Sequence, residues 1–119
     1  MPKKILVIDD DLEIIELLRK RLESLQYTVI TAGDGAVGFN MLQEHHPDLV
    51  VLDIVMPQMD GYTFVQELKR SANFKKLPVI IITAKADMEP LFLTEGVNSC
   101  LLKPIQIQVF LNKVRELIG

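Results

Sequence analysis

The chain has 119 residues, of which 49% are hydrophobic and 24% charged, so it is long enough for one soluble domain with an apolar core. We therefore expect a single domain over residues 1–119. The net charge of −3 gives no indication of direct nucleic-acid binding, and the single cysteine, Cys100, excludes an internal disulfide. The sequence contains no apolar run of membrane-spanning length and no signal peptide, so the expected location is the cytoplasm.

Short apolar runs alternate with amphipathic segments along the chain. The run Lys4–Ile8 predicts a buried strand, and apolar side chains at 12, 15, 18, 22 and 25 predict a helix over residues 11–25. The other expected elements are strands over 27–31, 49–52, 78–82 and 99–102, and helices over 36–45, 62–71, 88–95 and 106–118. Residues 73–76 should form a polar connection, and Gly96 should close the helix over 88–95. This alternation predicts one parallel sheet covered by helices on both faces.

The stretch from Asp48 to Gly61 is the centre of this pattern. Leu49–Leu52 is a continuous apolar run, typical of a strand buried on both faces, and Asp53 follows it directly. The carboxyl ends of parallel strands form the edge where open α/β sheets bind ligands. Pro57 prevents the strand from continuing, and Asp60-Gly61 favours a turn. Taken alone, Asp53 could be a ligand-binding residue or simply the cap of a turn.

Three adjacent acids, Asp9, Asp10 and Asp11, follow the first predicted strand. One of them can cap the next helix, but the other two then repel each other. At about 4 Å and an effective dielectric of 20, each such pair costs on the order of 4 kcal/mol before screening. This cost suggests a bound cation, and a solvated acidic turn is the alternative. Thr83 and Lys103 also stand at the carboxyl ends of predicted strands and should lie at the same edge.

The sequence resembles the receiver domain of bacterial two-component response regulators over essentially the whole chain. The matching elements, in order, are Val7–Asp10, Leu52–Gly61, Thr83-Ala84 and Lys103-Pro104. The fold class that this resemblance implies is α/β, with a flavodoxin-like, doubly wound five-stranded parallel sheet of order 2-1-3-4-5.

The resemblance also implies roles for these residues. Asp53 would accept a phosphoryl group, Thr83 would hydrogen-bond it, and Lys103 would pair first with Asp53 and then with a phosphoryl oxygen. The implied cofactor is Mg²⁺, with Mn²⁺ as a possible substitute. Its implied ligands are the carboxylates of Asp10 and Asp53, the carboxylate of Asp9 largely through water, and the backbone carbonyl of Val55.

The function that the resemblance implies is that of a phosphorylation-activated signalling domain, not an enzyme. The implied partners are a sensor histidine kinase or phosphotransfer protein, and a downstream effector domain or protein. A homodimer through the fourth predicted helix is possible, and nucleic acids and membranes are not expected as direct partners. The sequence leaves open whether the receiver stands alone or is part of a larger regulator.

Two other functions fit a strand-end aspartate less well. A haloacid-dehalogenase-like phosphatase would place a second Asp two residues after Asp53, where this chain has Val55. A flavodoxin-like flavin- or nucleotide-binding module would need a phosphate-binding loop rich in Gly, Ser or Thr after the first strand. The acids Asp9–Asp11 occupy that place and would repel phosphate.

The chain departs from the family pattern near the expected output face. Cys100 replaces the usual Tyr or Phe, and we interpret it as a buried core thiol. The segment from Thr83 to Gly96 is shorter than in most members and contains Pro90. The helix predicted there is unusually apolar, which fits either core packing or a partner-binding patch. Its apolar residues are Met88, Leu91, Phe92 and Leu93. The expected switch and output residues are Thr83, Cys100, Pro104 and Phe92.

Overall fold

The computed structural model describes residues 2–54, 61–84 and 96–119 of the chain. The strands in these ranges are β1 (Lys4–Ile8), β2 (Thr28–Ala32), β3 (Leu49–Asp53), β4 (Val79–Thr83) and β5 (Ser99–Leu102). The helices are α1 (Leu12–Ser24), α2 (Gly35–His45), α3 (Gly61–Arg70) and α5 (Ile107–Ile118). The strands form one parallel sheet of order β2-β1-β3-β4-β5, which confirms the predicted fold class and strand order.

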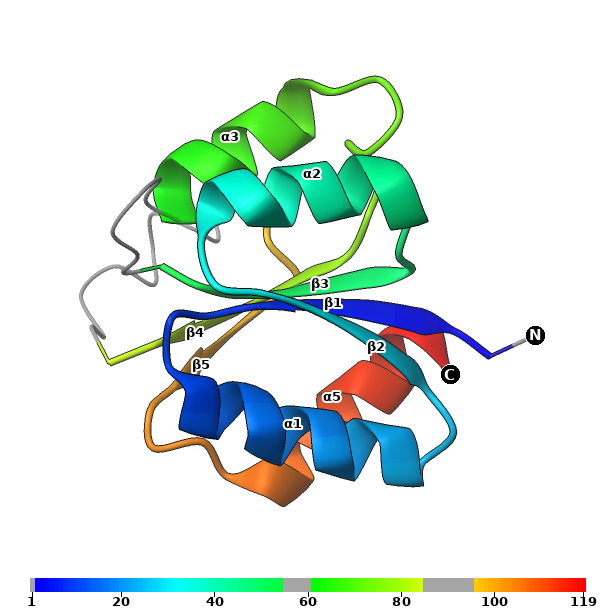
Figure 1. Ribbon diagram of the computed structural model, residues 1–119, viewed down its shortest axis with the longest axis vertical. Helices are drawn as coiled ribbons and strands as arrows, with labels where there is room; N and C mark the ends of the chain where they lie inside the picture. Colours follow the sequence, from blue (N-terminus) through cyan, green and yellow to red (C-terminus); the bar gives the residue numbers. More distant parts are fainter. Residues whose placement is uncertain (1, 55–60, 85–95) are drawn as a thin grey trace.

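Helices cover both faces of the sheet, with α2 and α3 on one side and α1 and α5 on the other (Figure 1). Side chains of a strand alternate between these two layers. In β1, Leu6 and Ile8 join the core under α2 and α3, whereas Ile5 and Val7 join the core against α1 and α5. Because both faces of the inner strands β1, β3 and β4 are buried, these strands are nearly continuous apolar runs, and this is why they could be recognised in the sequence.

Two glycines allow helices to approach the sheet closely. A Cβ atom at Gly38 in α2 would lie 2.6 Å from Cδ1 of Ile8 in β1. A Cβ atom at Gly61, the first residue of α3, would lie 2.9 Å from Cβ of Ile54, and the Gly61 amide donates to the Ile54 carbonyl at 2.9 Å. The second contact joins the start of α3 to the chain directly after Asp53.

The predicted apolar face of α1 is only partly correct. Ile15, Leu18 and Leu22 are buried, but Leu12 is 73% exposed and Leu25 is 38% exposed. Leu12 is the first helical residue and Leu25 follows the last. Helical spacing shows which side a residue faces but not how far the sheet extends beneath it, so the two ends of the predicted face project past the core.

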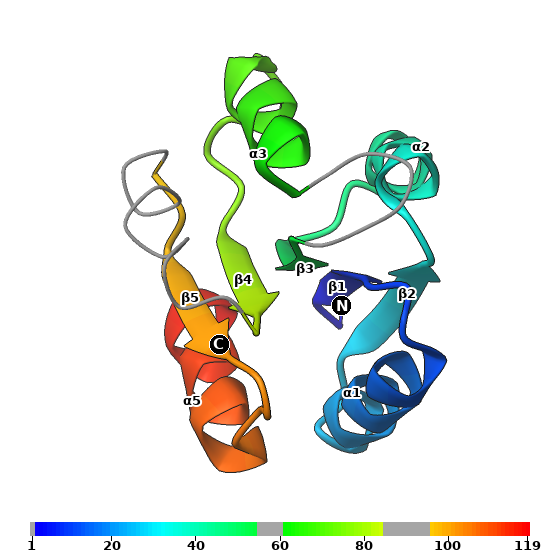
Figure 2. The same cartoon turned by 90° about the vertical axis from the view of Figure 1, so that its left-hand side faces the viewer.

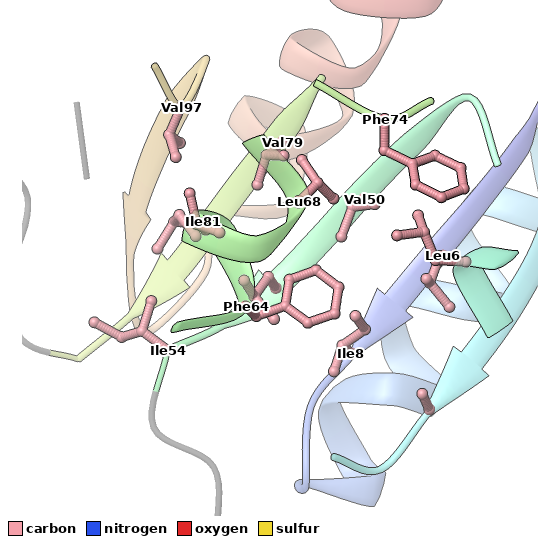
Figure 3. Close-up of a cluster of buried hydrophobic side chains, with 14 residues drawn as sticks. Leu6, Ile8, Val50, Ile54, Phe64, Leu68, Phe74, Val79, Ile81 and Val97 are labelled. Atoms are coloured by element: carbon pink, nitrogen blue, oxygen red, sulfur yellow. The ribbon is translucent and has the colours of Figure 1, made fainter. Parts of the chain in front are cut away.

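The connection between α3 and β4 was expected to be a polar loop, but Phe74 within it is buried. Figure 3 shows Phe74 as one of the labelled members of the cluster of buried side chains that also contains Leu6, Val50 and Val79. The ring of His46 lies against it, with centroids 5.7 Å apart. His46 ends α2 in the left-handed region, at φ 48°, and donates its amide to the carbonyl of Leu42.

Several predictions fall outside the described residues. These are the helix over 88–95, the end of the strand before Pro57, the Asp60 part of the turn at Asp60-Gly61, the backbone carbonyl of Val55, and the side chains of Met88, Pro90, Leu91, Phe92 and Leu93. Gly96, predicted to close that helix, has φ 85°, a conformation that favours glycine. Among the described helices, none is both long and apolar enough to cross a membrane.

Candidate functional site

The parallel sheet brings the predicted polar residues to one edge. Asp9 follows β1, Asp53 ends β3, Thr83 ends β4 and Lys103 follows β5. Figure 2 looks onto this side of the molecule, with β1, β3 and β4 as neighbouring strands. The register places Ile8 beside Leu52, so Asp9 and Asp53 are the next residues of adjacent strands. Residues far apart in the sequence therefore meet because each follows a strand of the same direction.

The acids Asp9, Asp10 and Asp53 form a compact cluster. One carboxylate oxygen from each lies within 4.8 Å of the others. Asp9 is 2% exposed and Asp53 is 5% exposed, whereas Asp10 is exposed at the rim. The site thus combines two buried carboxylates with one that solvent can reach.

Lys103 provides the counter-charge. Its Nζ donates a hydrogen bond to Oδ2 of Asp53 at 3.3 Å and forms an ion pair with Oδ2 of Asp9 at 3.5 Å. The backbone amide of Lys103 donates to the Thr83 carbonyl at 2.8 Å, which fixes where the lysine leaves the sheet. One ammonium therefore faces two buried carboxylates, and the exposed Asp10 adds a third negative charge.

The pKa values of Asp9 and Lys103 are perturbed. Burial raises the pKa of Asp9 from 3.8 to about 6; the hydrogen bond from the Asp11 amide opposes this rise, Asp53 adds to it, and Lys103 lowers it. Burial alone would lower the pKa of Lys103, but attraction to Asp9 and Asp53 and hydrogen bonds to both outweigh it, so its pKa is raised. The ammonium therefore stays charged, and it offsets only part of the cost of burying the charged Asp9 carboxylate.

The three adjacent acids have three different environments, which the sequence left open. Oδ1 of Asp11 accepts the Glu13 amide at 3.0 Å and so caps α1. The Asp11 amide donates to Oδ1 of Asp9 at 2.9 Å and holds that carboxylate in place. Asp10 takes neither role. The expected site residues did not include Asp11, which positions the Asp9 carboxylate through its backbone amide. Its place two residues after an Asp could have indicated this role, because Asp side chains often accept a hydrogen bond from the amide two residues later.

The remaining predicted residues lie on β4 and β5 or just beyond. Thr83 is fully buried at the end of β4. Cys100 packs against the core under α2 and α3 but is only half-buried, so the prediction of a buried core thiol is confirmed in part. The reason is that β5 is an edge strand and has a neighbour on one side only. Pro104 is exposed, and the peptide bond between Lys103 and Pro104 is cis.

The cluster fits a hard divalent cation such as Mg²⁺. Carboxylate oxygens are the ligands that Mg²⁺ prefers, and three of them converge here. Burial, with a smaller contribution from Asp53, raises the pKa of Asp9 because it disfavours the charged carboxylate, and a bound cation would stabilise that charge. The protein groups available within the described residues are Asp9, Asp10 and Asp53.

Comparison with known families gives one clear match. The family model described as "Response regulator receiver domain" matches residues 5–115. Over 118 residues the chain is 37% identical to the probable transcriptional regulator ycf27 of Cyanophora paradoxa, with 98% of this chain and 48% of that protein covered. Over 120 residues it is 35% identical to the DNA-binding dual master transcriptional regulator RpaA of a Synechocystis species, covering 99% and 49%. The chain therefore spans about half the length of these curated relatives.

Comparison with solved structures supports the same family and fold. The response regulator TrrA from Thermotoga maritima, solved in complex with Mg(2+)-BeF, matches with a TM-score of 0.88 at 28% identity and covers 98% of this chain and 99% of that chain. The chemotaxis protein CheY4 of Vibrio cholerae has a TM-score of 0.91 over 99% of this chain, and at 24% identity it supports the fold alone. The family match over residues 5–115, the strand order and the acidic edge agree, and the chain belongs to the response regulator receiver domain family of two-component signal transduction.

Proposed function

We propose that Asp53 accepts a phosphoryl group from a phosphohistidine on a sensor histidine kinase or phosphotransfer protein, and that residues 1–119 act as one receiver unit. The observation that carries this proposal is the position of Asp53. It ends the central strand, is 5% exposed, and has Lys103 at 3.3 Å and the carboxylates of Asp9 and Asp10 beside it. Asp9, Asp10 and Lys103 thus surround the Asp53 carboxylate.

The transfer forms one bond and breaks one. An oxygen of the Asp53 carboxylate attacks phosphorus, the phosphorus–nitrogen bond of the phosphohistidine breaks, and its electron pair returns to the imidazole ring. The product is an acyl phosphate on Asp53, which water later hydrolyses. Because both reactants are anionic, the reaction depends on positioning and on charge neutralisation.

The residues divide these tasks. Asp9, Asp10 and Asp53 would hold Mg²⁺, or Mn²⁺ as a substitute, which neutralises phosphoryl charge when bound. Lys103 would move from the Asp53 carboxylate to a phosphoryl oxygen, a short shift that a flexible lysine can make. The hydroxyl of Thr83 would donate a hydrogen bond to another phosphoryl oxygen. The carbonyl of Val55 remains an expected metal ligand outside the described residues.

The output of phosphorylation is proposed to pass through Thr83 and Lys103 to the neighbouring surface of β5 and α5, with Cys100 and Pro104 next to them. The receiver would in this way control an effector domain or effector protein. In this role it is a phosphoacceptor that assists its own phosphotransfer and dephosphorylation. A homodimer through the fourth predicted helix, with Phe92 as an anchor, stays part of the proposal and concerns residues outside the described ranges.

Labelling with a small phosphodonor tests the acceptor. Incubated with Mg²⁺ and acetyl phosphate, the wild-type chain should gain the mass of one phosphoryl group in intact-mass spectrometry, and Asp53→Asn should gain none. Asp48→Asn is the matched control, because Asp48 precedes the same strand at its opposite end, and it should label like the wild type. Equal labelling of Asp53→Asn and the wild type would refute the assignment.

A further inference from the structure

A second charged region lies in the segment from Lys69 to Lys76. These eight residues carry four cations and no acid, in a chain whose net charge is −3. The cations are Lys69, Arg70, Lys75 and Lys76, which we call the basic patch. Arg70, Lys75 and Lys76 are exposed and Lys69 is half-buried. Basic side chains near a helix C-terminus are common, but only two of these four lie in the last turn of α3, so the helix dipole does not account for the patch.

The backbone holds these cations together in a defined shape. Phe74 is buried in the core and anchors the middle of the segment. Around it, the amides of Phe74 and Lys75 both donate to the Ser71 carbonyl, at 3.3 and 3.0 Å. Nζ of Lys69 donates to the Lys75 carbonyl at 3.3 Å, so it sits beside the two lysines that follow. The patch is thus a built surface and not a disordered charge run.

The charges of the patch are not neutralised. Within the described ranges, none of its four cations takes part in an ion pair. Burial lowers the pKa of Lys69, and its hydrogen bond goes to a neutral carbonyl. The acid next to the segment in the sequence is Glu67, two residues before Lys69, and it forms no ion pair with the patch in the described ranges. An incoming anion would meet partly desolvated and unpaired positive charge.

The patch and the phosphoryl site lie at opposite ends of the sheet. Lys75 and Lys76 precede β4, whereas Thr83 ends it. A strand of five residues spans about 16 Å at 3.3 Å per residue, which is beyond the Debye length of about 8 Å at physiological salt. In Figure 1 the α3–β4 connection lies at the end of the molecule where the N-terminus also lies. A partner on the patch would leave the phosphoryl site open.

The observations favour an acidic polypeptide over nucleic acid as the partner. Proteins that hold single strands stack bases on several exposed aromatic rings. In the described ranges every Phe and Tyr side chain is buried or half-buried, and near the patch only the imidazole ring of His46 is exposed. A duplex is a long, dense anion, and it would also meet the field of a chain with net charge −3. A short acidic segment of a protein needs to contact only the patch.

From this surface we infer that the basic patch is a docking site for an acidic segment of a partner protein, and that its occupancy is independent of phosphorylation at the opposite edge. The exposed Arg70, Lys75 and Lys76 supply the attraction, and Lys69 and Phe74 hold the surface in shape. Such a contact would keep the receiver bound to one partner protein while Asp53 exchanges a phosphoryl group with a second protein.

Fluorescence anisotropy with a labelled oligoglutamate peptide tests the inference on the full chain. The patch variant replaces Arg70, Lys75 and Lys76 with Gln, and leaves Lys69 in place. The matched control makes the same change in net charge on the other helical layer, at the exposed residues Lys20, Arg21 and Arg115. We expect the patch variant to bind about tenfold more weakly than the wild type, since exposed ion pairs contribute modestly, and the control variant to bind within about twofold of it.

Three further measurements on the same proteins complete the test. Far-UV circular dichroism melting should show all three proteins folded, because every replaced side chain is exposed. Beryllofluoride with Mg²⁺ should leave oligoglutamate binding unchanged. A labelled duplex oligonucleotide should bind more weakly than oligoglutamate. Equal weakening in the patch and control variants, tighter binding of the duplex, no oligoglutamate binding by the wild type, or a large effect of beryllofluoride would each overturn the inference.

Discussion

Neutralising Asp9 should stabilise the protein in the absence of metal, because the charged carboxylate is held where it is unfavourable. Its pKa is raised from 3.8 to about 6, chiefly by burial. At 1.36 kcal/mol per pH unit, that difference corresponds to about 3 kcal/mol of native-state destabilisation by the charged form. The change Asp9→Asn keeps an oxygen for the Asp11 amide but leaves Lys103 with one partner fewer. We therefore expect a gain of about 1–3 kcal/mol at pH 8.

The effect should depend on pH with a defined sign. Since the folded-state pKa of Asp9 is the higher one, the native state still holds a proton at pH values where the unfolded chain has lost it. The contribution of Asp9 to stability therefore falls as pH rises from about 4 to about 6, and stays at the lower level above that window. Asn does not titrate, so the advantage of Asp9→Asn should be small at pH 4 and should grow through this window.

Urea unfolding in EDTA, followed by far-UV circular dichroism at pH 4 and pH 8, measures both quantities. Glu23→Gln is the control, because Glu23 is an exposed acid on α1, and removing it should change stability by less than about 0.5 kcal/mol. The reasoning fails if Asp9→Asn is less stable than the wild type at pH 8. It also fails if the difference between the two proteins is the same at both pH values.

Two further predictions follow from the metal site and from the close helix contacts. Mg²⁺ at a hundred times its dissociation constant should stabilise the wild type by about 2.7 kcal/mol, and Asp10→Asn should lose most of this stabilisation. The metal site is misassigned if Mg²⁺ leaves the melting temperature of the wild type unchanged, or if Asp10→Asn responds as the wild type does. Gly61→Ala should cost about 2–3 kcal/mol in urea unfolding, because its Cβ would meet the backbone and Cβ of Ile54. At Gly38 the added Cβ would meet side-chain atoms of Ile8 and no backbone atom, and alanine gains helix propensity, so Gly38→Ala should cost less, about 1 kcal/mol. Equal losses in the two variants would contradict this prediction.

The inner strands β1, β3 and β4 could be predicted from the sequence because they are buried on both faces. The run Leu49–Leu52 contains only apolar residues, which indicates a strand buried on both faces, and the observed strand β3 is one residue longer. The meeting of Asp9, Asp53 and Lys103 followed as well, because parallel strands share one carboxyl edge. Contacts between residues far apart in the sequence were thus predictable where each residue follows a parallel strand, because all such strand ends meet at one edge of the sheet.

The errors share a different cause, which is that burial depends on what lies beneath or beside a residue. Leu12 has helical spacing but projects past the sheet. Phe74 sits in a polar stretch yet fills the end of the core. Cys100 lies in a strand, but that strand is at the edge. Local sequence does not contain these neighbours, so periodicity alone could not decide them.

The site and the basic patch show the same conflict between local and global preference. Asp9 is a charged residue held in a buried place, at a cost in stability, and Lys103 offsets that cost only in part. On the far side, Lys69 is partly desolvated among other cations, with a neutral carbonyl as its hydrogen-bond acceptor. Sequences fold best when local and global preferences agree, so places where they disagree are where a ligand can supply what is missing. In this receiver the missing charge is positive at one edge and negative at the other, which is why the two sites should take oppositely charged partners.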